Sequence, residues 1–531
     1  MSNPILETSF LADSPAGKQW SRIGIHNHHG MVIPLFSIRS QNSCGIGEYL
    51  DLIPLIDWCH QIGFSVIQLL PLNDNGKNPS PYSTLSAYAL NPLHLSLYNL
   101  PFLEEFHDLK EMLQTIPKFS SDAHIPYPSV QKNKEAFLLK YVQRAREKIL
   151  ASENYRIFIS QAPWLRTYAA FKALKIHFNW KSWMEWPLHY QNANSALLDE
   201  IEEDFKDAVQ IHSIIQFLCF EQLKKVKEYA ESKQLFIMGD IPILTDRDSA
   251  DVWLHRNLFD LNLAAGAPPD HFNDEGQNWG FPLYNWDQIA QDHYRWWYER
   301  LQYASNFYQI YRIDHIVGLF RIWGIPRGKK TKEGHFCPKD PAAWLPHGKK
   351  ILLEFLKASS MLPIGEDLGV VPPEVRTCLH SLGISGMKVI RWERDWDHTQ
   401  AYMPYDTYPP ASLTTVSTHD TEPLGLWWKN QPQEAMEFCR FKGWHYQPTL
   451  NIDELKTILF DSHHTPSLFH INLIQEYLQL VPSLSWPTFE QDVINYPGII
   501  SDKNWSYRIK PSIEELTTNM SLMHLMREII A

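Results

Sequence analysis

The spacing of short apolar runs is the feature of this sequence that most restricts its fold. Eight runs are rich in apolar and β-branched residues, and longer stretches able to form helices separate several of them. The runs are continuous rather than alternating in polarity, as expected for parallel strands that are covered on both faces. They comprise residues 31–36, 65–70, 235–241, 308–314, 361–366, 386–391, 413–418 and 478–483. This order predicts an α/β protein built on a (β/α)8 TIM barrel.

The gaps between the runs are uneven, and the largest one predicts an insertion. Residues 95–234 are too many for one connection between a strand and the next helix, and they contain strong helical patterns. These patterns cover 135–150, 163–178 and 211–233. We therefore expect a single catalytic barrel over residues 1–531 with a largely helical insertion at 95–234. A separate domain at this place is the weaker alternative. A smaller helical insertion is expected at 430–476.

Charge and cysteine usage exclude several classes of protein. The chain has 48 basic and 60 acidic residues, a formal charge of −12, which argues against nucleic acid or an anionic membrane as the main partner. The six cysteines are scattered without a CxxC pair, so neither a disulfide framework nor a zinc site is predicted. No stretch approaches the roughly 18 uninterrupted apolar residues of a membrane span, and no signal peptide is evident. These features predict a cytoplasmic protein.

Three acidic residues stand at or just beyond the ends of predicted strands. They are Asp314, Glu366 and Asp420. Catalytic groups of a barrel lie at the carboxyl ends of its strands, and cleavage of a glycosidic bond needs two carboxyl groups that flank the bond. Arg312 precedes Asp314 by two residues, so both side chains leave the strand on the same face. A nearby guanidinium favours an ionised carboxylate, as a nucleophile requires.

Two of these acids also have a structural interpretation. Arg312 and Asp314 form a plausible ion pair at a strand end, and Glu366 is equally compatible with a helix cap or a loop. Asp367 is expected to point away from the barrel lumen, because neighbouring strand residues face opposite sides. A buried histidine such as His419 more often belongs to the core. The functional alternative is that His419 donates a hydrogen bond to a hydroxyl group of the sugar.

The motifs around these residues resemble a known family. RIDH at 312–315, GEDLG at 365–369 and STHD at 417–420 occur in the order found in the amylomaltases, or disproportionating enzymes, of glycoside hydrolase family 77. The resemblance covers almost the whole chain. It extends over residues 33–49, 69–93, 239–253 and 266–286, and over NYPGI and NWSYR near the C-terminus.

The resemblance implies a 4-alpha-glucanotransferase that transfers part of an α-1,4-glucan through a covalent glucosyl-enzyme. By this resemblance Asp314 is the nucleophile, Glu366 the general acid/base and Asp420 the transition-state stabiliser. The implied substrate-binding residues are Tyr82, Asp240, Gln277, Trp279, Arg312 and His419. Gln277 and Trp279 belong to a lid expected over residues 264–300. The implied partners are malto-oligosaccharides derived from starch or glycogen, with glucose as an acceptor.

No cofactor or metal is expected. His26, His28 and His29 lie close together, but their spacing fits no tetrahedral site. The acids at 246, 248 and 251 lack the glycine and the terminal glutamate of a calcium loop.

Two other functions remain open from the sequence. A glucan hydrolase needs the same carboxylates. The resemblance over the whole chain favours transfer, and so does the expected lid, which would hold an acceptor and disfavour water. A non-catalytic glucan-binding protein is the third possibility, although the three acids are all present. His271 stands where many family members have tyrosine, and Thr421 where many have asparagine. Both departures are expected to affect acceptor preference.

Overall fold

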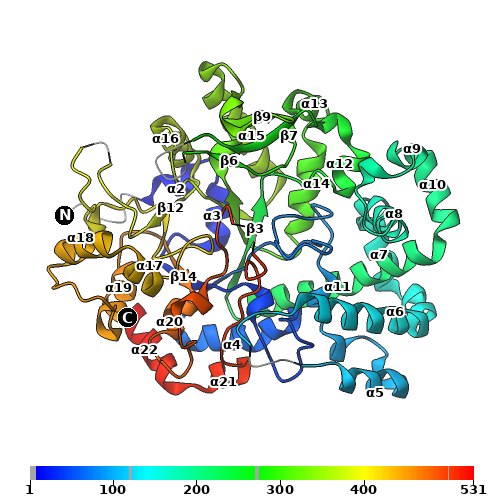
Figure 1. Cartoon of the computed structure of the whole chain (residues 1–531), viewed down its shortest axis with the longest axis horizontal. Coiled ribbons are helices and arrows are strands. Elements are labelled where there is room, and N and C mark those ends of the chain that lie inside the picture. The colour runs from blue at the N-terminus through cyan, green and yellow to red at the C-terminus, as the bar shows by residue number, and fades with distance from the viewer. Residues whose placement is uncertain (1–7, 119–121, 270–273, 397, 500) are drawn as a thin grey trace.

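A closed barrel of eight parallel strands forms the centre of the molecule (Figure 1). The computed structural model describes residues 8–118, 122–269, 274–396, 398–499 and 501–531. In sequence order the barrel strands are β1 (His28–Val32), β2 (Val66–Gln68), β3 (Phe236–Pro242), β8 (Ile310–Asp314), β11 (Leu362–Gly365), β12 (Gly386–Val389), β13 (Ser412–Thr415) and β14 (Phe469–Leu473). Neighbouring strands in this order pair in parallel from β1 to β11 and from β12 to β14, and β14 pairs with β1.

One backbone contact closes the seam between β11 and β12. Ile364 forms a parallel bridge with Ser385, and the N–H of Gly365 donates to the carbonyl oxygen of Ser385 at 2.8 Å. The predicted (β/α)8 barrel is therefore confirmed. Because the strands are singly wound in sequence order, all eight carboxyl ends lie at one mouth of the barrel.

The last predicted strand is wrong. Residues 478–483 start at the final residue of helix α20 (Ile474–Leu478), whereas the eighth strand is β14, with the sequence FHINL. Two buried polar side chains interrupt the apolar pattern of this strand. His470 Nδ1 contacts the Ser462 carbonyl oxygen at 2.8 Å, and Asn472 Oδ1 accepts from the N–H of Val416 at 2.9 Å. The strand can bury these groups because they have partners.

The position of β14 also corrects the range 430–476, in which only helices were expected. Helices α18 (Pro432–Lys442) and α19 (Ile452–His463) occupy its first part, and the barrel strand follows.

Helices surround the barrel and fill the long segment between β2 and β3. The helices of this segment are α5 (His107–Thr115), α6 (Tyr127–Ala151), α7 (Glu153–Gln161), α8 (Trp164–His177), α9 (Leu188–Gln191), α10 (Ser195–Asp204) and α11 (Lys206–Ser232). They form one side of the molecule (Figure 1). Helix α11 packs against α6, α8 and the barrel helix α4 (Leu52–Ile62), so it joins this segment to the barrel.

Other helices and two small sheets complete the fold. The helices that flank the remaining strands include α3 (Gly17–Ile23), α14 (Arg295–Ala304), α15 (Pro341–Ala358), α16 (Pro373–Leu382), α17 (Leu424–Asn430) and α22 (Met520–Ile530). Strands β5 (Leu263–Ala267), β6 (Gln277–Asn278), β9 (Ile322–Pro326) and β10 (His335–Cys337) form an antiparallel sheet. Strands β4 (Phe259–Asp260) and β7 (Leu283–Tyr284) form a separate pair. No helix in the described ranges is long and apolar enough to cross a membrane.

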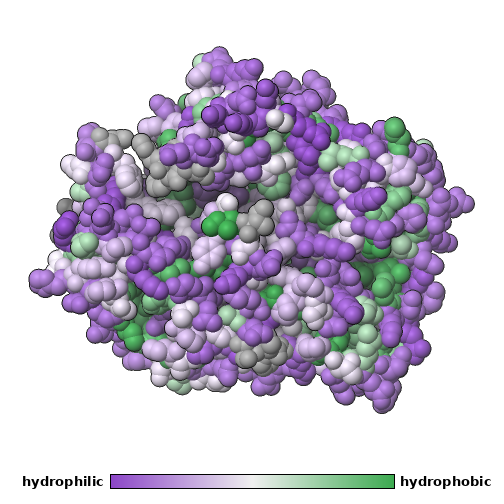
Figure 2. All heavy atoms as spheres, in the orientation of Figure 1, coloured by the Kyte–Doolittle hydropathy of each residue, from purple (hydrophilic) through white to green (hydrophobic). Residues whose placement is uncertain are grey.

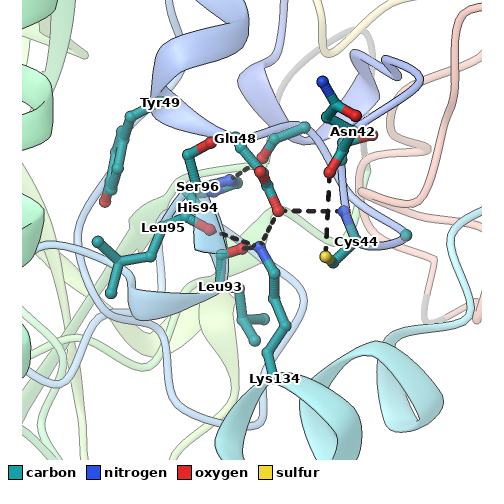
Figure 3. Close-up of polar contacts among 12 residues, drawn as sticks. Asn42, Cys44, Glu48, Tyr49, Leu93, His94, Leu95, Ser96 and Lys134 are labelled. Atoms are coloured by element: carbon teal, nitrogen blue, oxygen red, sulfur yellow. Dashed lines mark hydrogen bonds and ion pairs between the residues drawn. The ribbon is translucent and has the colours of Figure 1, made fainter. Parts of the chain in front are cut away.

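A buried ion pair attaches helix α6 to the segment after β1 (Figure 3). Lys134 Nζ lies 2.7 Å from Glu48 Oε1, and the two side chains are 0% and 1% exposed. The same ammonium donates to the carbonyl oxygens of Leu93 and Leu95 at 2.6 and 2.8 Å. The N–H of Cys44 donates to Glu48 Oε1 at 3.0 Å. All three ammonium donors are used, as burial of a charge requires.

We predict that Lys134→Met lowers the free energy of unfolding by about 3–5 kcal/mol, because Glu48 loses its counter-charge in a buried place. Denaturant unfolding monitored by circular dichroism measures the change. The matched control is Lys456→Met, whose pair with Glu528 is half-exposed at 2.6 Å and which is expected to cost less than about 1 kcal/mol. Equal losses in the two variants would contradict the importance of the buried pair.

Candidate active site

Arg312 lies at the centre of a group of carboxylates at the mouth of the barrel. Its Nη1 is 2.7 Å from Asp240 Oδ2 and 2.9 Å from Asp314 Oδ1, and its Nη2 is 4.0 Å from Glu366 Oε2. These residues come from the adjacent strands β3 and β8 and from the residue after β11. Parallel register places Asp240 beside Arg312 and Ile364 on its other side. The barrel thus brings together four residues that are far apart in the sequence.

Glu366 is held by two backbone groups and enclosed by protein. Its Oε2 accepts from the N–H of His315 and its Oε1 from the N–H of Leu368, both at 2.8 Å. Burial raises the pKa of Glu366 to about 7; Arg312 opposes this shift and the charge of Asp314 adds to it. A carboxyl group with this pKa can both give and take a proton near neutrality.

Two other acids close to Glu366 have different surroundings. The side chain of Asp314 is 26% exposed. Asp367 accepts from the N–H of Met387 at 2.7 Å and pairs with Arg376 of the outer helix α16 at 3.1 Å. The prediction that Asp367 points away from the lumen is therefore confirmed.

Asp420 stands on the opposite side of the group and is fixed by two side chains. Its Oδ1 accepts from Asn495 Nδ2 at 2.7 Å, and its Oδ2 lies 3.1 Å from His419 Nε2. Its enclosure by protein favours a higher pKa, but His419, Asn495 and Arg312 together lower the pKa of Asp420 to about 2. The side chain is nevertheless 42% exposed, so it is an ionised acceptor open to the cleft.

Tyr82 links the two sides of the site. Its hydroxyl donates to Asp240 Oδ2 at 2.7 Å and lies 2.8 Å from His419 Nε2. The ring stacks on His419 at a centroid distance of 5.6 Å and an angle of 14°. Burial disfavours the charged imidazolium of His419, but Asp420 and its hydrogen bond raise the pKa above the ordinary value. Tyr82, Asp240 and His419 are thus joined in one polar chain.

Gln277 and Trp279 reach the site through His315. Trp279 Nε1 donates to Gln277 Oε1 at 2.9 Å, and the indole ring meets His315 edge-on at 5.0 Å. The N–H of His315 is one of the two donors to Glu366. Gln277 itself lies in β6 of the small sheet, next to β5. His271 lies outside the described residues.

All nine site residues expected from the sequence therefore lie in one connected network, and the structure adds three more. Asn495 contacts Asp420, His315 contacts Glu366, and the Trp505 ring lies 5.5 Å from that of Tyr82. The segments NYPGI and NWSYR contain Asn495 and Trp505, but no spacing rule connects them with residues 75 or more positions away. Only the folded chain brings them to the site.

Figure 2 shows one face of the molecule, which is mainly hydrophilic and has a hollow near its centre. A small cavity adjoins the site and is lined by Gln68, Arg312, Thr415 and His419, among others. The described residues contain no group of three or more histidines, cysteines or acids arranged to hold a metal ion. Asp251, one of the acids of the calcium-like sequence, accepts from the N–H of Ala87 at 2.8 Å.

The arrangement can support acid and nucleophilic chemistry at one bond. Asp314 and Glu366 both lie within 4.0 Å of one guanidinium, and one of them is open to the cleft while the other titrates near neutrality. Two carboxyl groups with separate environments are the requirement for glycosidic bond cleavage.

Known protein sequences match this chain over nearly its whole length. A family model described as 4-alpha-glucanotransferase matches residues 33–515. A 4-alpha-glucanotransferase of Chlamydia muridarum is 45% identical over 527 residues, which are 98% of this chain and 99% of the relative. A 4-alpha-glucanotransferase of Chlamydia trachomatis is 43% identical over 518 residues, 97% of each chain.

Solved structures share the fold. The amylomaltase from Streptococcus agalactiae in complex with acarbose superposes with a TM-score of 0.78 at 24% identity, over 95% of this chain and 98% of that chain. The amylomaltase from Corynebacterium glutamicum gives a TM-score of 0.78 at 21% identity, over 97% and 76% of the two chains.

We predict that Asp314→Asn lowers the pKa of Glu366, because the negative charge of Asp314 disfavours ionisation of its neighbour. Carbon-13 NMR titration of carboxyl-labelled glutamate measures the shift, and the resonance is assigned by its loss in Glu366→Gln. Asp13→Asn, an exposed substitution at the other end of the chain, is the control and is expected to leave the titration unchanged. A pKa that stays near 7 in Asp314→Asn would contradict the proposed coupling.

Proposed function

The chain belongs to the 4-alpha-glucanotransferase family and is an enzyme that acts on α-1,4-glucans, and we propose that it works by retaining double displacement on Asp314. It moves a segment of a malto-oligosaccharide to the 4-hydroxyl of a second glucan or of glucose. The observation that carries this proposal is the guanidinium of Arg312, which lies between the carboxylates of Asp314 and Glu366.

In the first step Asp314 attacks the anomeric carbon of the donor sugar. The bond from this carbon to the glycosidic oxygen breaks, and protonated Glu366 gives its proton to the leaving oxygen. The raised pKa of Glu366 supports this role, because the acid form is populated near neutrality. Arg312 stabilises the negative charge of Asp314 from 2.9 Å. The product is a glycosyl ester on Asp314 and a shortened glucan.

Asp420 and its partners hold the sugar while positive charge develops on its ring. The Asp420 carboxylate has a pKa of about 2 and is 42% exposed, so it can accept hydrogen bonds from sugar hydroxyls. His419, Tyr82 and Asp240 form the polar chain beside it and supply further donors and acceptors. These fixed groups need no reorganisation during the reaction.

In the second step an acceptor sugar replaces the departed glucan. Its 4-hydroxyl gives a proton to ionised Glu366, and its oxygen attacks the anomeric carbon and releases Asp314. We propose that the segment 264–300 acts as a lid, with Trp279 and Gln277 as contacts for the acceptor. A held acceptor and reduced access of water favour transfer over hydrolysis. The hydrolase alternative lacks a comparable supporting feature.

We also propose that the enzyme acts in the cytoplasm, on malto-oligosaccharides derived from storage glucans. The six cysteines are unpaired thiols that are mostly buried, as is usual in a reducing compartment. The acidic surface suits a neutral substrate.

Two substitutions separate the roles of the two carboxyl groups. We predict that Asp314→Ala slows glucose release from maltotriose by roughly a thousandfold or more, because the covalent step is lost. Glu366→Gln is expected to slow it by at least about a hundredfold. With α-maltosyl fluoride, whose leaving group needs no proton, Glu366→Gln should still release the first equivalent of fluoride rapidly, because only the second step then needs the base, whereas Asp314→Ala should not. Activity of Asp314→Ala within tenfold of the unmodified enzyme would remove Asp314 from the nucleophile role.

Products from maltotriose distinguish transfer from hydrolysis. We predict glucose together with maltotetraose and longer chains, separated by anion-exchange chromatography, and Trp279→Ala should raise the share of hydrolysis products at least threefold. Trp396→Ala, which removes an exposed tryptophan with no predicted role in the site, is the control. Glucose and maltose alone from the unmodified enzyme would indicate a hydrolase instead.

A further inference from the structure

We propose that a pocket outside the catalytic cleft binds a segment of neutral α-1,4-glucan and gives the enzyme a second attachment point on long chains. The pocket has a volume of about 860 Å³. It lies where the β4–β7 pair, helix α13 (Trp286–Gln291), helix α15 and the turn after β8 meet. Its polar and aromatic lining includes Arg256, Asp260, Asn262, Trp286, Asp287 and His347.

The pocket is separate from the catalytic group but shares a wall with it. None of Asp314, Glu366 and Asp420 lines it, whereas Ile243 and Gly318 do. A Cβ atom at Gly318 would lie 2.5 Å from Ile243 Cδ1 and 2.8 Å from His315 Cδ2, so these three residues are in close contact. His315 is the residue whose N–H donates to Glu366. The pocket therefore lies behind the wall of the active site.

Arg256 gives the pocket a cation with unused hydrogen-bonding capacity. Its guanidinium carbon lies 4.4 Å from the centre of the Trp183 ring, and its Nη2 is buried without a hydrogen-bond partner among the described residues. Arg256 lines the pocket, and a guanidinium there can donate hydrogen bonds to the oxygen atoms of a ligand.

The charges of the lining favour a neutral ligand. Asp260 and Asp287 oppose the single charge of Arg256, and burial lowers the pKa of His347, so the imidazole is neutral at pH 7. An anion would face two carboxylates for one guanidinium. A sugar hydroxyl, in contrast, both donates to a carboxylate and accepts from a guanidinium. Neighbouring hydroxyls of a glucan can satisfy both kinds of group at once.

Trp286 supplies an aromatic surface of the kind that packs on sugar rings. It is half-buried and held by the buried Trp297, whose ring is stacked at 6.3 Å, and by His347 at 5.8 Å. Apolar side chains complete the lining, namely Ile243, Leu244, Phe259, Leu283, Leu319 and Ile322. The C–H faces of glucose need such a surface, while its edges need the polar groups.

The size of the pocket predicts which substrates it affects. A volume of about 860 Å³ is within the usual range for ligand sites and suits a few sugar units. A chain held there and in the cleft gains from a high effective concentration, but only if it is long enough to reach both places. The pocket should therefore matter for amylose or glycogen and not for maltotriose.

Native gels cast with and without glycogen test the proposal on the full chain. Variants are made in an Asp314→Ala background, which prevents turnover of the glycogen. Arg256→Met and Asp260→Asn should each weaken the apparent affinity for glycogen at least threefold. Arg22→Met and Asp13→Asn make the same charge changes at exposed positions elsewhere and should behave like the parent. Unchanged retardation of both pocket variants would overturn the proposal.

Kinetics in the active enzyme provide the second measurement. Arg256→Met and Asp260→Asn, both outside the proposed lid, should keep kcat/KM for maltotriose within twofold of the unmodified enzyme and lower kcat/KM for amylose at least threefold. Equal effects on the two substrates would also overturn the proposal. The choice of ligand rests on the proposed function, but the two can fail separately. Maltotriose products test the reaction, whereas retardation of the inactive variants tests the pocket.

Discussion

The sharing of one buried guanidinium among three carboxylates is the interaction on which the active site depends. Arg312 is 5% exposed, and a buried cation of this kind is stable only with close counter-charges. Asp240, Asp314 and Glu366 provide them from strands on either side and from its own strand. The same contacts hold the two proposed catalytic carboxyl groups near each other without direct pairing. One set of ion pairs thus stabilises the buried Arg312 and positions the carboxyl groups. Removal of Arg312 or of one of its carboxylates would leave an uncompensated charge.

Environment gives three chemically similar side chains different roles. Glu366 is enclosed and titrates at about 7, although two backbone donors favour its charged form. Asp420 has a pKa of about 2, because His419 and Asn495 stabilise its negative charge. The separation of these values allows one carboxyl group to carry a proton while the other stays ionised throughout the reaction.

The long connections between the barrel strands are attached to the barrel by packing and by buried ion pairs. The buried pair of Lys134 and Glu48 attaches helix α6 to the segment after β1. The helices between β2 and β3 are therefore held against the barrel by side-chain contacts as well as by the chain connections. On another side, the small sheet and helices α13 and α15 enclose the pocket that contains Arg256 and Trp286. Gly318 and Ile243 of that pocket contact His315, so the proposed second glucan site lies directly behind the wall of the active site.

The sequence alone determined the barrel, seven of its strands and the placement of three acids at strand ends, because continuous apolar runs and the acids that follow them are local patterns. It did not identify β14, since His470 and Asn472 interrupt the apolar pattern and are accommodated only by partners elsewhere in the fold. Nor did it connect Asn495 with Asp420, because closure of the barrel creates that contact. The pKa of Glu366 depends on its burial and on the nearby charges of Arg312 and Asp314. Both result from three-dimensional packing, so only the tertiary structure determines this pKa.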